Sequence, residues 1–144
     1  QIEKFDYILE KRREKAARYD EMLSRRCPFL KTPHVPAGYY HTYQSYVTMV
    51  DYAALGLPGV PEGNAFRNRL MGYLEEHGVS TRQGTHAVHM LGYYRDKYGY
   101  RPASLPGAYA CDLLSLTLPL YVELSADDHE YVVEQLEKGM QAVR

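Results

Sequence analysis

The chain has 144 residues, 45% of them hydrophobic and 24% charged, which is enough apolar material for one globular domain with a buried core. Lys and Arg number 17 against 18 Asp and Glu, so the formal net charge of -1 disfavours nucleic acid and anionic membranes as partners. No apolar run approaches the roughly 20 residues of a membrane span, and no signal-peptide pattern begins the sequence. The two cysteines, Cys27 and Cys111, make neither a metal spacing nor a disulfide framework. We therefore expect a soluble, cytoplasmic protein.

Residues 1–26 are predicted to form one long amphipathic helix. Apolar residues recur along one face from Ile2 to Leu23, and acidic and basic side chains alternate on the other face, as on a solvated helix surface. At roughly 1.5 Å per residue the helix would be about 40 Å long, more than a small domain requires. Because Gln1 already lies in the helical register, we expect the chain to be a piece of a longer protein, with this helix leading in from another domain.

The next elements are predicted from their turn residues. Residues 27–38 carry three prolines and are expected to be an extended connection. Residues 43–51 are rich in tyrosine and valine and predict a strand, and the Gly/Pro-rich residues 55–63 predict a loop. Asn64 is a good N-cap for a helix that ends at Gly78.

The middle of the chain is predicted to turn from a strand into a helix. Residues 79–81 are typical of a short strand end, and Gly84 breaks that strand. Thr85 is then a suitable N-cap for a helix over about residues 86–98.

The last third is predicted to hold a short helix, a strand and a final helix. Pro106 opens the short helix through Asp112, and the almost wholly apolar residues 113–120 predict a buried central strand. Ser125 and Asp128 mark the acidic start of the final helix. The whole pattern predicts an α+β fold: a small three-stranded, largely antiparallel sheet covered by helices and preceded by the long helix. We expect a single domain over residues 1–144, with residues 1–26 as a linking helix and 39–144 as a small α/β subdomain.

The richest polar stretch is residues 78–91, which we take as the candidate site. The expected geometry directs Arg82 and the first amides of the helix at one point, and such a helix entry suits an anionic group such as a phosphate or carboxylate. An ion pair between Arg82 and a carboxylate such as Asp112 is an equally good explanation of that arginine.

Two histidines, His86 and His89, are spaced i and i+3, which can place two imidazoles on a metal ion. No third ligand is evident, so we expect no metal, with one histidine contacting a ligand and the other serving packing or capping. Tyrosines near residue 40 and over 93–100 could stack on a sugar ring, although core or interface packing is the favoured explanation. With no strained nucleophile turn, the residues alone predict a domain that binds an anionic small molecule.

A family resemblance adds to this reading. The run Ser80-Thr81-Arg82, then Thr85, His86 and His89, followed by residues 114–121 and the acidic helix over 125–136, resembles the C-terminal part of the DegT/DnrJ/StrS group of nucleotide-sugar aminotransferases. Residues 1–23 also look like the long helix that leaves the cofactor domain in that group. The resemblance covers essentially the whole chain.

The resemblance implies a fold like that of aspartate aminotransferase, in which a large domain holds pyridoxal 5'-phosphate on a lysine. It implies homodimers that move an amino group from glutamate to a keto-sugar on a nucleotide diphosphate. Arg82, Thr85, His86 and His89 would then bind the nucleotide-sugar substrate.

The resemblance also implies what this chain lacks. The cofactor lysine belongs to the large domain, and none of the six lysines here has a suitable context, so we expect no catalytic residue, no covalently bound cofactor and no activity of this chain alone. The alternative is a stand-alone, non-catalytic binding or dimerisation module of the same fold. A gene that continues upstream into a lysine-bearing domain would favour the enzyme.

Overall fold

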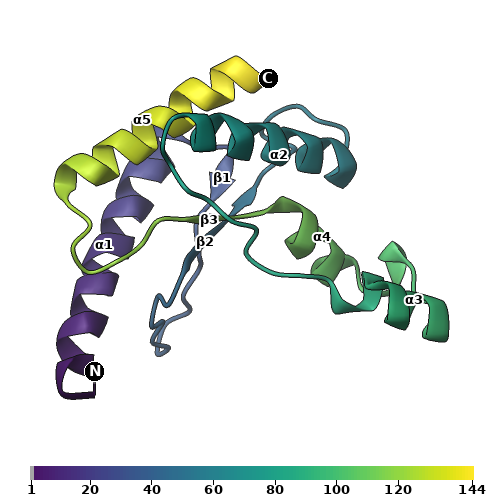
Figure 1. Ribbon diagram of the computed structural model, residues 1–144, viewed down its shortest axis with the longest axis horizontal. Coiled ribbons are helices and arrows are strands. Elements are labelled where there is room, and N and C mark those ends of the chain that lie inside the picture. The colour runs from purple at the N-terminus through teal and green to yellow at the C-terminus, as the bar shows by residue number, and fades with distance from the viewer. Residues whose placement is uncertain (1) are drawn as a thin grey trace.

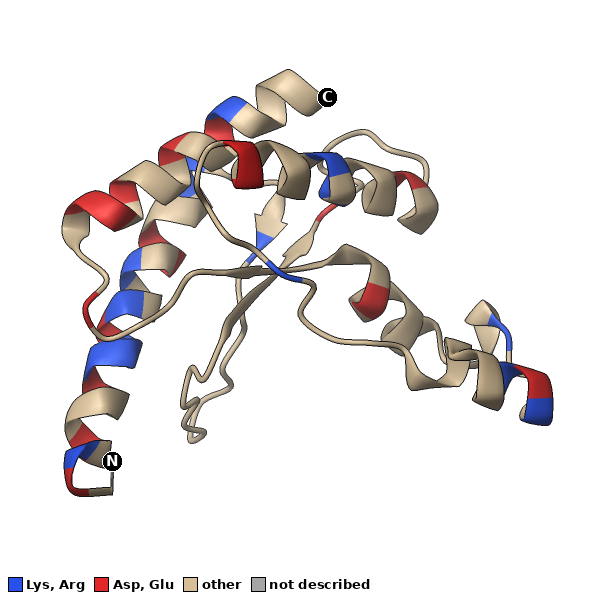
Figure 2. Ribbon diagram, viewed as in Figure 1, with Lys and Arg blue, Asp and Glu red and all other residues tan. Residues whose placement is uncertain are grey.

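The long first helix is present in the computed structural model, which describes residues 2–144. A 3-10 turn, Ile2–Lys4, runs into α1 (Phe5–Arg26), which confirms the predicted helix; Gln1 lies outside the described residues. Figure 2 shows basic and acidic residues interspersed along it. Tyr19 and Leu23 are fully buried, whereas Ile2 is 92% and Phe5 56% exposed. Only the C-terminal half of the apolar stripe is therefore covered by this chain.

Three short strands form one antiparallel sheet in the order β1-β2-β3. They are β1 (Leu30–Lys31), β2 (Tyr46–Val50) and β3 (Ser115–Leu118). The number of strands and their antiparallel pairing confirm the predicted α+β architecture.

Three details of the sheet differ from the prediction. The apolar run that we expected to be the central strand is β3, at one edge, and β2 is central. The strand predicted over 79–81 reduces to a single bridge between Arg82 and Thr117. The third strand, β1, lies instead in the proline-rich connection, where Pro28 and Pro33 flank the two paired residues and do not interrupt them.

The second helix, α2 (Val60–Glu76), begins four residues before the predicted cap. Pro61 lies in its first turn, where the backbone amides need no helical partner, so the Gly/Pro-rich segment is partly helical rather than a loop. Asn64 is inside the helix, and its side chain donates a hydrogen bond to the Leu113 carbonyl at 2.8 Å. Gly78, with φ +74°, follows the helix end as predicted.

The two helices predicted near the C-terminus are confirmed as α4 (Pro106–Leu114) and α5 (Ala126–Val143). Ser125 and Asp128 form a reciprocal capping box at the start of α5. Along its length α5 packs against α2 and α1 (Figure 1).

The core lies between one face of the sheet and helices α1, α2 and α5 (Figure 1). Tyr46 and Val50 of β2 are buried on that face, and the Tyr46 ring lies 5.0 Å from the Tyr19 ring of α1. On the opposite face Val47 and Thr117 are only half-buried, and the segment that contains Arg82 and Gly84 lies beside them. Among residues 2–144, no helix is both long enough and apolar enough to cross a membrane.

The segment between Ala87 and α4 projects away from the body of the domain (Figure 1). It holds a 3-10 turn, Val88–Met90, the helix α3 (Gly92–Tyr98) and a second 3-10 turn, Pro102–Ser104. Every residue from 91 to 108 is exposed. The single helix predicted over 86–98 is therefore wrong in its first half, because Leu91 is extended and separates the turn from α3.

Candidate functional site

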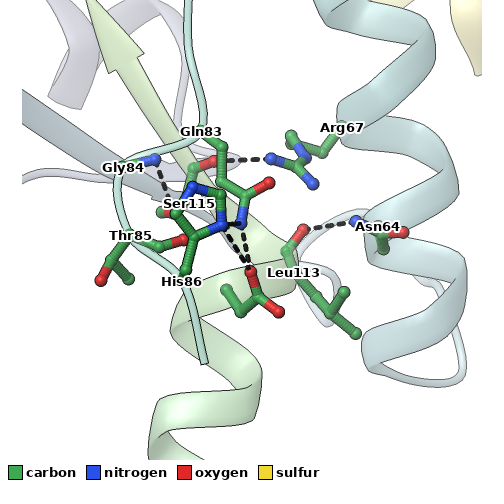
Figure 3. Close-up of polar contacts among 9 residues, drawn as sticks. Asn64, Arg67, Gln83, Gly84, Thr85, His86, Leu113 and Ser115 are labelled. Carbon is green, nitrogen blue, oxygen red and sulfur yellow. Dashed lines mark hydrogen bonds and ion pairs between the residues drawn. The ribbon is translucent and has the colours of Figure 1, made fainter. Parts of the chain in front are cut away.

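The candidate site is built on a segment that runs along the free edge of β3. The backbone of Arg82 exchanges two hydrogen bonds with Thr117, at 3.3 and 2.7 Å. The amide of Gly84 donates to Ser115 Oγ at 3.0 Å (Figure 3). A Cβ on Gly84 would lie 2.4 Å from Val47 Cγ1. The segment therefore approaches the half-buried face of the sheet so closely that only glycine fits at this position.

This docking corrects the prediction of an anion site at a helix N-terminus. Thr85 is exposed and caps no helix, because the chain remains non-helical through Ala87. The backbone groups of Arg82 and Gly84 are instead committed to β3 and Ser115, which holds the segment extended. His86 and His89 accordingly do not share a face of one helix, and the i, i+3 argument for two imidazoles on a metal falls away.

The structure separates His89 from the other three predicted site residues. Arg82, Thr85 and His86 are exposed, with 73% of the His86 side chain accessible. His89 is only 5% exposed, and both of its ring nitrogens are buried without a hydrogen-bond partner. Its ring meets the Tyr100 ring edge-on at 6.3 Å. The packing role allowed for one of the two histidines therefore falls to His89.

Beneath the exposed residues, Gln83 is the centre of a polar cluster (Figure 3). Its side-chain nitrogen donates to Asp112 Oδ1 and to the Thr85 carbonyl, the latter at 2.7 Å, and lies 3.2 Å from His86 Nδ1. Asp112, which the sequence offered as a partner for Arg82, thus contacts Gln83. Sequence reasoning passed over Gln83, and its one signal was its position between Arg82 and the glycine that sets the close approach.

A buried arginine, Arg67 of α2, supports the same region from the other side. It is 4% exposed, its Nη1 donates to the Ser115 carbonyl at 3.2 Å, and its Nε is buried without a partner. Burial lowers the pKa of the guanidinium, and the negative charge of Asp112 partly opposes that shift. Arg67 was also missed from sequence, because an arginine in an amphipathic helix is ordinarily assigned to the solvated face.

A cleft of about 310 Å³ lies beside the segment, between α2 and residues 80–81. Its lining combines apolar and polar groups: Asn68, Met71, Gly72, Glu75, Ser80 and Thr81. Across residues 2–144, no cluster of three or more His, Cys, Asp or Glu side chains could hold a metal ion. The site can therefore offer hydrogen bonds and one exposed guanidinium to a ligand.

The profile of the DegT/DnrJ/EryC1/StrS aminotransferase family matches residues 1–137. The chain belongs to this family. The spore coat polysaccharide biosynthesis protein SpsC of Bacillus subtilis is 30% identical over 134 residues, which cover 93% of this chain and 32% of that protein. The pleiotropic regulatory protein of Geobacillus stearothermophilus is 27% identical over 132 residues, which cover 91% of this chain and 32% of that protein.

Solved structures of aminotransferases share the fold. The aminotransferase TlmJ from Streptoalloteichus hindustanus matches with a TM-score of 0.76 and 28% identity, over 97% of this chain and 34% of that one. Helicobacter pylori PseC, an aminotransferase involved in the biosynthesis of pseudoaminic acid, matches with a TM-score of 0.80 and 15% identity, over 99% of this chain and 35% of that one. The DegT/DnrJ/EryC1/StrS chain described here thus spans about a third of the length of the relatives it matches.

Proposed function

We propose that this chain is the substrate-facing, C-terminal domain of a pyridoxal 5'-phosphate-dependent aminotransferase that moves an amino group from glutamate to a nucleotide-linked keto-sugar. The observation that carries the proposal is the family match over residues 1–137, which spans the long helix, the sheet and the segment on β3. In this proposal the enzyme is a cytoplasmic homodimer, and the rest of the family fold supplies the cofactor site.

The surface of α1 supports the proposal that another domain packs here. The uncovered half of its apolar stripe borders a groove of about 290 Å³, lined by Phe5, Ile8, Leu9, Arg12, Thr42 and Gln44. Arg12 Nη1 donates to the carbonyls of Tyr43 and Gln44, at 2.9 and 2.7 Å, and so fixes the loop that forms one wall. A preformed apolar groove on a helix is expected to be covered in the working protein.

The candidate site supports a substrate-binding role for Arg82, Thr85 and His86. All three are exposed on a segment whose backbone is fixed to β3, so their positions are set before a ligand arrives. A guanidinium suits the diphosphate of a nucleotide sugar, and hydroxyl and imidazole groups suit sugar oxygens. His89, buried against Tyr100, would act through packing of the segment.

In this proposal, none of the lysines of this chain has the surroundings expected of the lysine that holds pyridoxal 5'-phosphate. Aminotransferases of this family depend on that cofactor, which is held as an imine to a lysine in enzymes of this kind. Lys11, Lys31 and Lys138 pair with carboxylates at the surface, at 2.7, 2.9 and 2.6 Å. Lys97 lies over two tyrosine rings, Lys4 is exposed, and Lys15 is half-buried on α1. We therefore place the cofactor lysine outside these 144 residues.

Kinetics of the 144-residue chain and of a complete enzyme that carries it test this function. The chain alone, with pyridoxal 5'-phosphate, glutamate and a nucleotide-linked keto-sugar, is expected to give no turnover. Measurable turnover would refute the proposal that the cofactor lysine lies outside these 144 residues. In the complete enzyme, Arg82→Ala should raise the Michaelis constant for the sugar nucleotide and leave cofactor absorbance unchanged. Arg25→Ala is the matched control, because Arg25 is exposed and pairs only with the exposed Glu21. Unchanged kinetics in Arg82→Ala would remove Arg82 from the site.

A further inference from the structure

The arm, which we define as residues 88–105, carries an apolar surface that the rest of residues 2–144 does not cover. Six of its large side chains are between 39% and 62% exposed: Val88, Leu91, Tyr93, Tyr94, Tyr98 and Leu105. The helix α3 within it makes its main contacts with the turn Val88–Met90, which belongs to the arm itself. Monomeric proteins rarely expose contiguous apolar surface of more than a few hundred Å². We therefore expect the arm to be covered in the working protein.

The aromatic part of this surface is ordered by contacts within the arm. The Tyr93 ring meets the Tyr94 ring edge-on at 5.2 Å, and Tyr94 stacks on Tyr98 at 6.4 Å. Lys97 Nζ lies over the Tyr93 and Tyr98 rings, at 5.1 and 5.4 Å. The arm has four tyrosines and a single acidic residue, Asp96. Tyrosine is enriched and acidic residues are depleted in the cores of protein interfaces, so this composition favours a protein surface as the occupant.

The base of the arm also holds a buried polar side chain that residues 2–144 leave unsatisfied. His89 is 5% exposed, and neither of its ring nitrogens has a hydrogen-bond partner among these residues. Burial of a polar group without a hydrogen bond costs free energy. The arm is therefore incomplete in two respects, an uncovered apolar surface and an unsatisfied imidazole, and a covering protein surface can supply both.

The position of the arm favours one covering body over another. The proposed large domain packs on the uncovered half of α1, at the groove that Phe5 and Leu9 help to line. That half of α1 and the arm lie at opposite ends of the longest axis of the structure (Figure 1). A large domain seated on α1 would have to extend along the whole of that axis to cover the arm as well. A second subunit meets the arm directly, because the arm points away from its own body.

We propose that the arm is a dimer contact that packs on the second subunit of the complete enzyme. This inference rests on the proposed function, because it takes the enzyme to be a homodimer whose large domain covers the α1 groove. A stable interface has about 20–30 residues on each side, and the 18 residues from 88 to 105 supply most of one side.

The dimer contact also acts on the candidate site, because the arm joins its two parts. It begins two residues after His86 and ends at α4, whose Asp112 accepts a hydrogen bond from Gln83. Both ends of the arm are therefore next to residues of the polar cluster. The second subunit thereby holds the substrate segment of the first in place.

Photo-crosslinking of the complete enzyme identifies the body that the arm contacts. Tyr98→p-benzoylphenylalanine places the reactive group on a side chain that is 55% exposed, and irradiation should give a species of twice the subunit mass on a denaturing gel. Tyr121→p-benzoylphenylalanine is the control, because Tyr121 is 45% exposed and lies outside the arm, and it should stay at the subunit mass. A crosslink within one subunit would assign the arm to its own large domain and overturn the proposal. Failure to crosslink would leave the arm in solvent or on a sugar ring and overturn it too.

Sedimentation equilibrium of the complete enzyme measures how much the arm stabilises the dimer. Leu91→Ser and Tyr98→Ser remove exposed side chains, so each variant should keep its fold and raise the Kd of the dimer by about thirtyfold, as expected of a central interface residue. Tyr121→Ser is the matched control and should leave the Kd within about twofold. An unchanged Kd in both arm variants would overturn the proposal.

Activity measured on the same proteins separates this inference from the proposed function. A dimer that crosslinks through Tyr98 but transfers no amino group to a nucleotide-linked keto-sugar would support the arm contact and refute the proposed function. An active enzyme whose Tyr98 crosslinks only within one subunit would overturn the arm contact and leave the proposed function standing.

Discussion

Gly84→Ala is expected to destabilise the chain because the new methyl group has no room. Its carbon would lie 2.4 Å from Val47 Cγ1 and 3.1 Å from Ser115 Cβ, whereas carbon atoms pack at about 3.5–4.0 Å, so the segment must move by more than about 1 Å. Overpacking of this kind costs about 1–3 kcal/mol, and the movement also strains the Gly84–Ser115 hydrogen bond. We expect a loss of about 2 kcal/mol, a fall of roughly 4–8 °C in Tm for a chain of this size.

Urea denaturation of four variants tests the cause of that loss: Gly84→Ala, Val47→Ala, the double variant and Gly72→Ala. In a Val47→Ala background the clashing methyl is gone, so the added cost of Gly84→Ala should fall to less than about 1 kcal/mol. Gly72→Ala is the control, because Gly72 lies within α2 and nothing lies within 4 Å of a Cβ placed there. At that position alanine should raise the free energy of unfolding by about 0.5–1 kcal/mol. A Gly84→Ala protein as stable as wild type, or an equal loss in both backgrounds, would refute the close-packing explanation.

Three further perturbations test the body of the domain. Gly139→Ala should cost about 1–3 kcal/mol in urea denaturation, because its Cβ would meet Leu70 Cδ1 at 2.7 Å; a neutral result would contradict the observed α2–α5 approach. Ser125→Ala should cost about 1 kcal/mol and Ser125→Asn much less, since the cap accepts from the Asp128 amide; equal losses would argue against capping. Burial lowers the pKa of His129 below the roughly 6.5 of an unfolded histidine, so the unfolded chain binds the extra proton first. Stability should therefore be constant above about pH 6.5 and fall as the pH drops below it, and His129→Gln should flatten this slope; an unchanged slope would exclude His129 as the cause.

Much of the architecture was predictable because local patterns and tertiary packing agree. The apolar stripe of α1, the Ser125 capping box and Pro106 at the start of α4 each specify an element whatever surrounds it. The strand over Tyr46–Val50 likewise carries its own β-branched and aromatic signal.

The errors arose where tertiary contacts override local preference. Thr85 has the chemistry of an N-cap, but Gly84 lets the backbone approach Val47 and bond to Ser115, and this docking keeps the segment extended. The sequence near residue 84 does not indicate that Ser115, 31 positions later, is its partner. The order of strands in the sheet has the same origin, because the two-residue β1 is specified only by its pairing with β2.

The candidate stretch remains a prediction, but its expected geometry, a helix that begins at Thr85, was wrong. The sequence left open which of His86 and His89 contacts a ligand and which serves packing, and in the structure His86 is exposed and His89 is buried. Gln83 and Arg67 escaped notice because their roles depend on Asp112 and Ser115, which lie far away in the sequence. A single sequence reveals chemistry within a few residues but carries no direct sign of such long-range contacts.

The most direct test of the substrate-facing role is a chemical-shift map of the 15N-labelled chain titrated with a uridine diphosphate sugar. At about 10 mM ligand, well above a Kd of about 1 mM, the amides from Arg82 to His86 should shift with saturation, and Arg82→Ala should abolish the shifts while Arg25→Ala preserves them. Shifts confined to other elements, or a response that survives Arg82→Ala unchanged, would contradict the assignment of this segment to the substrate.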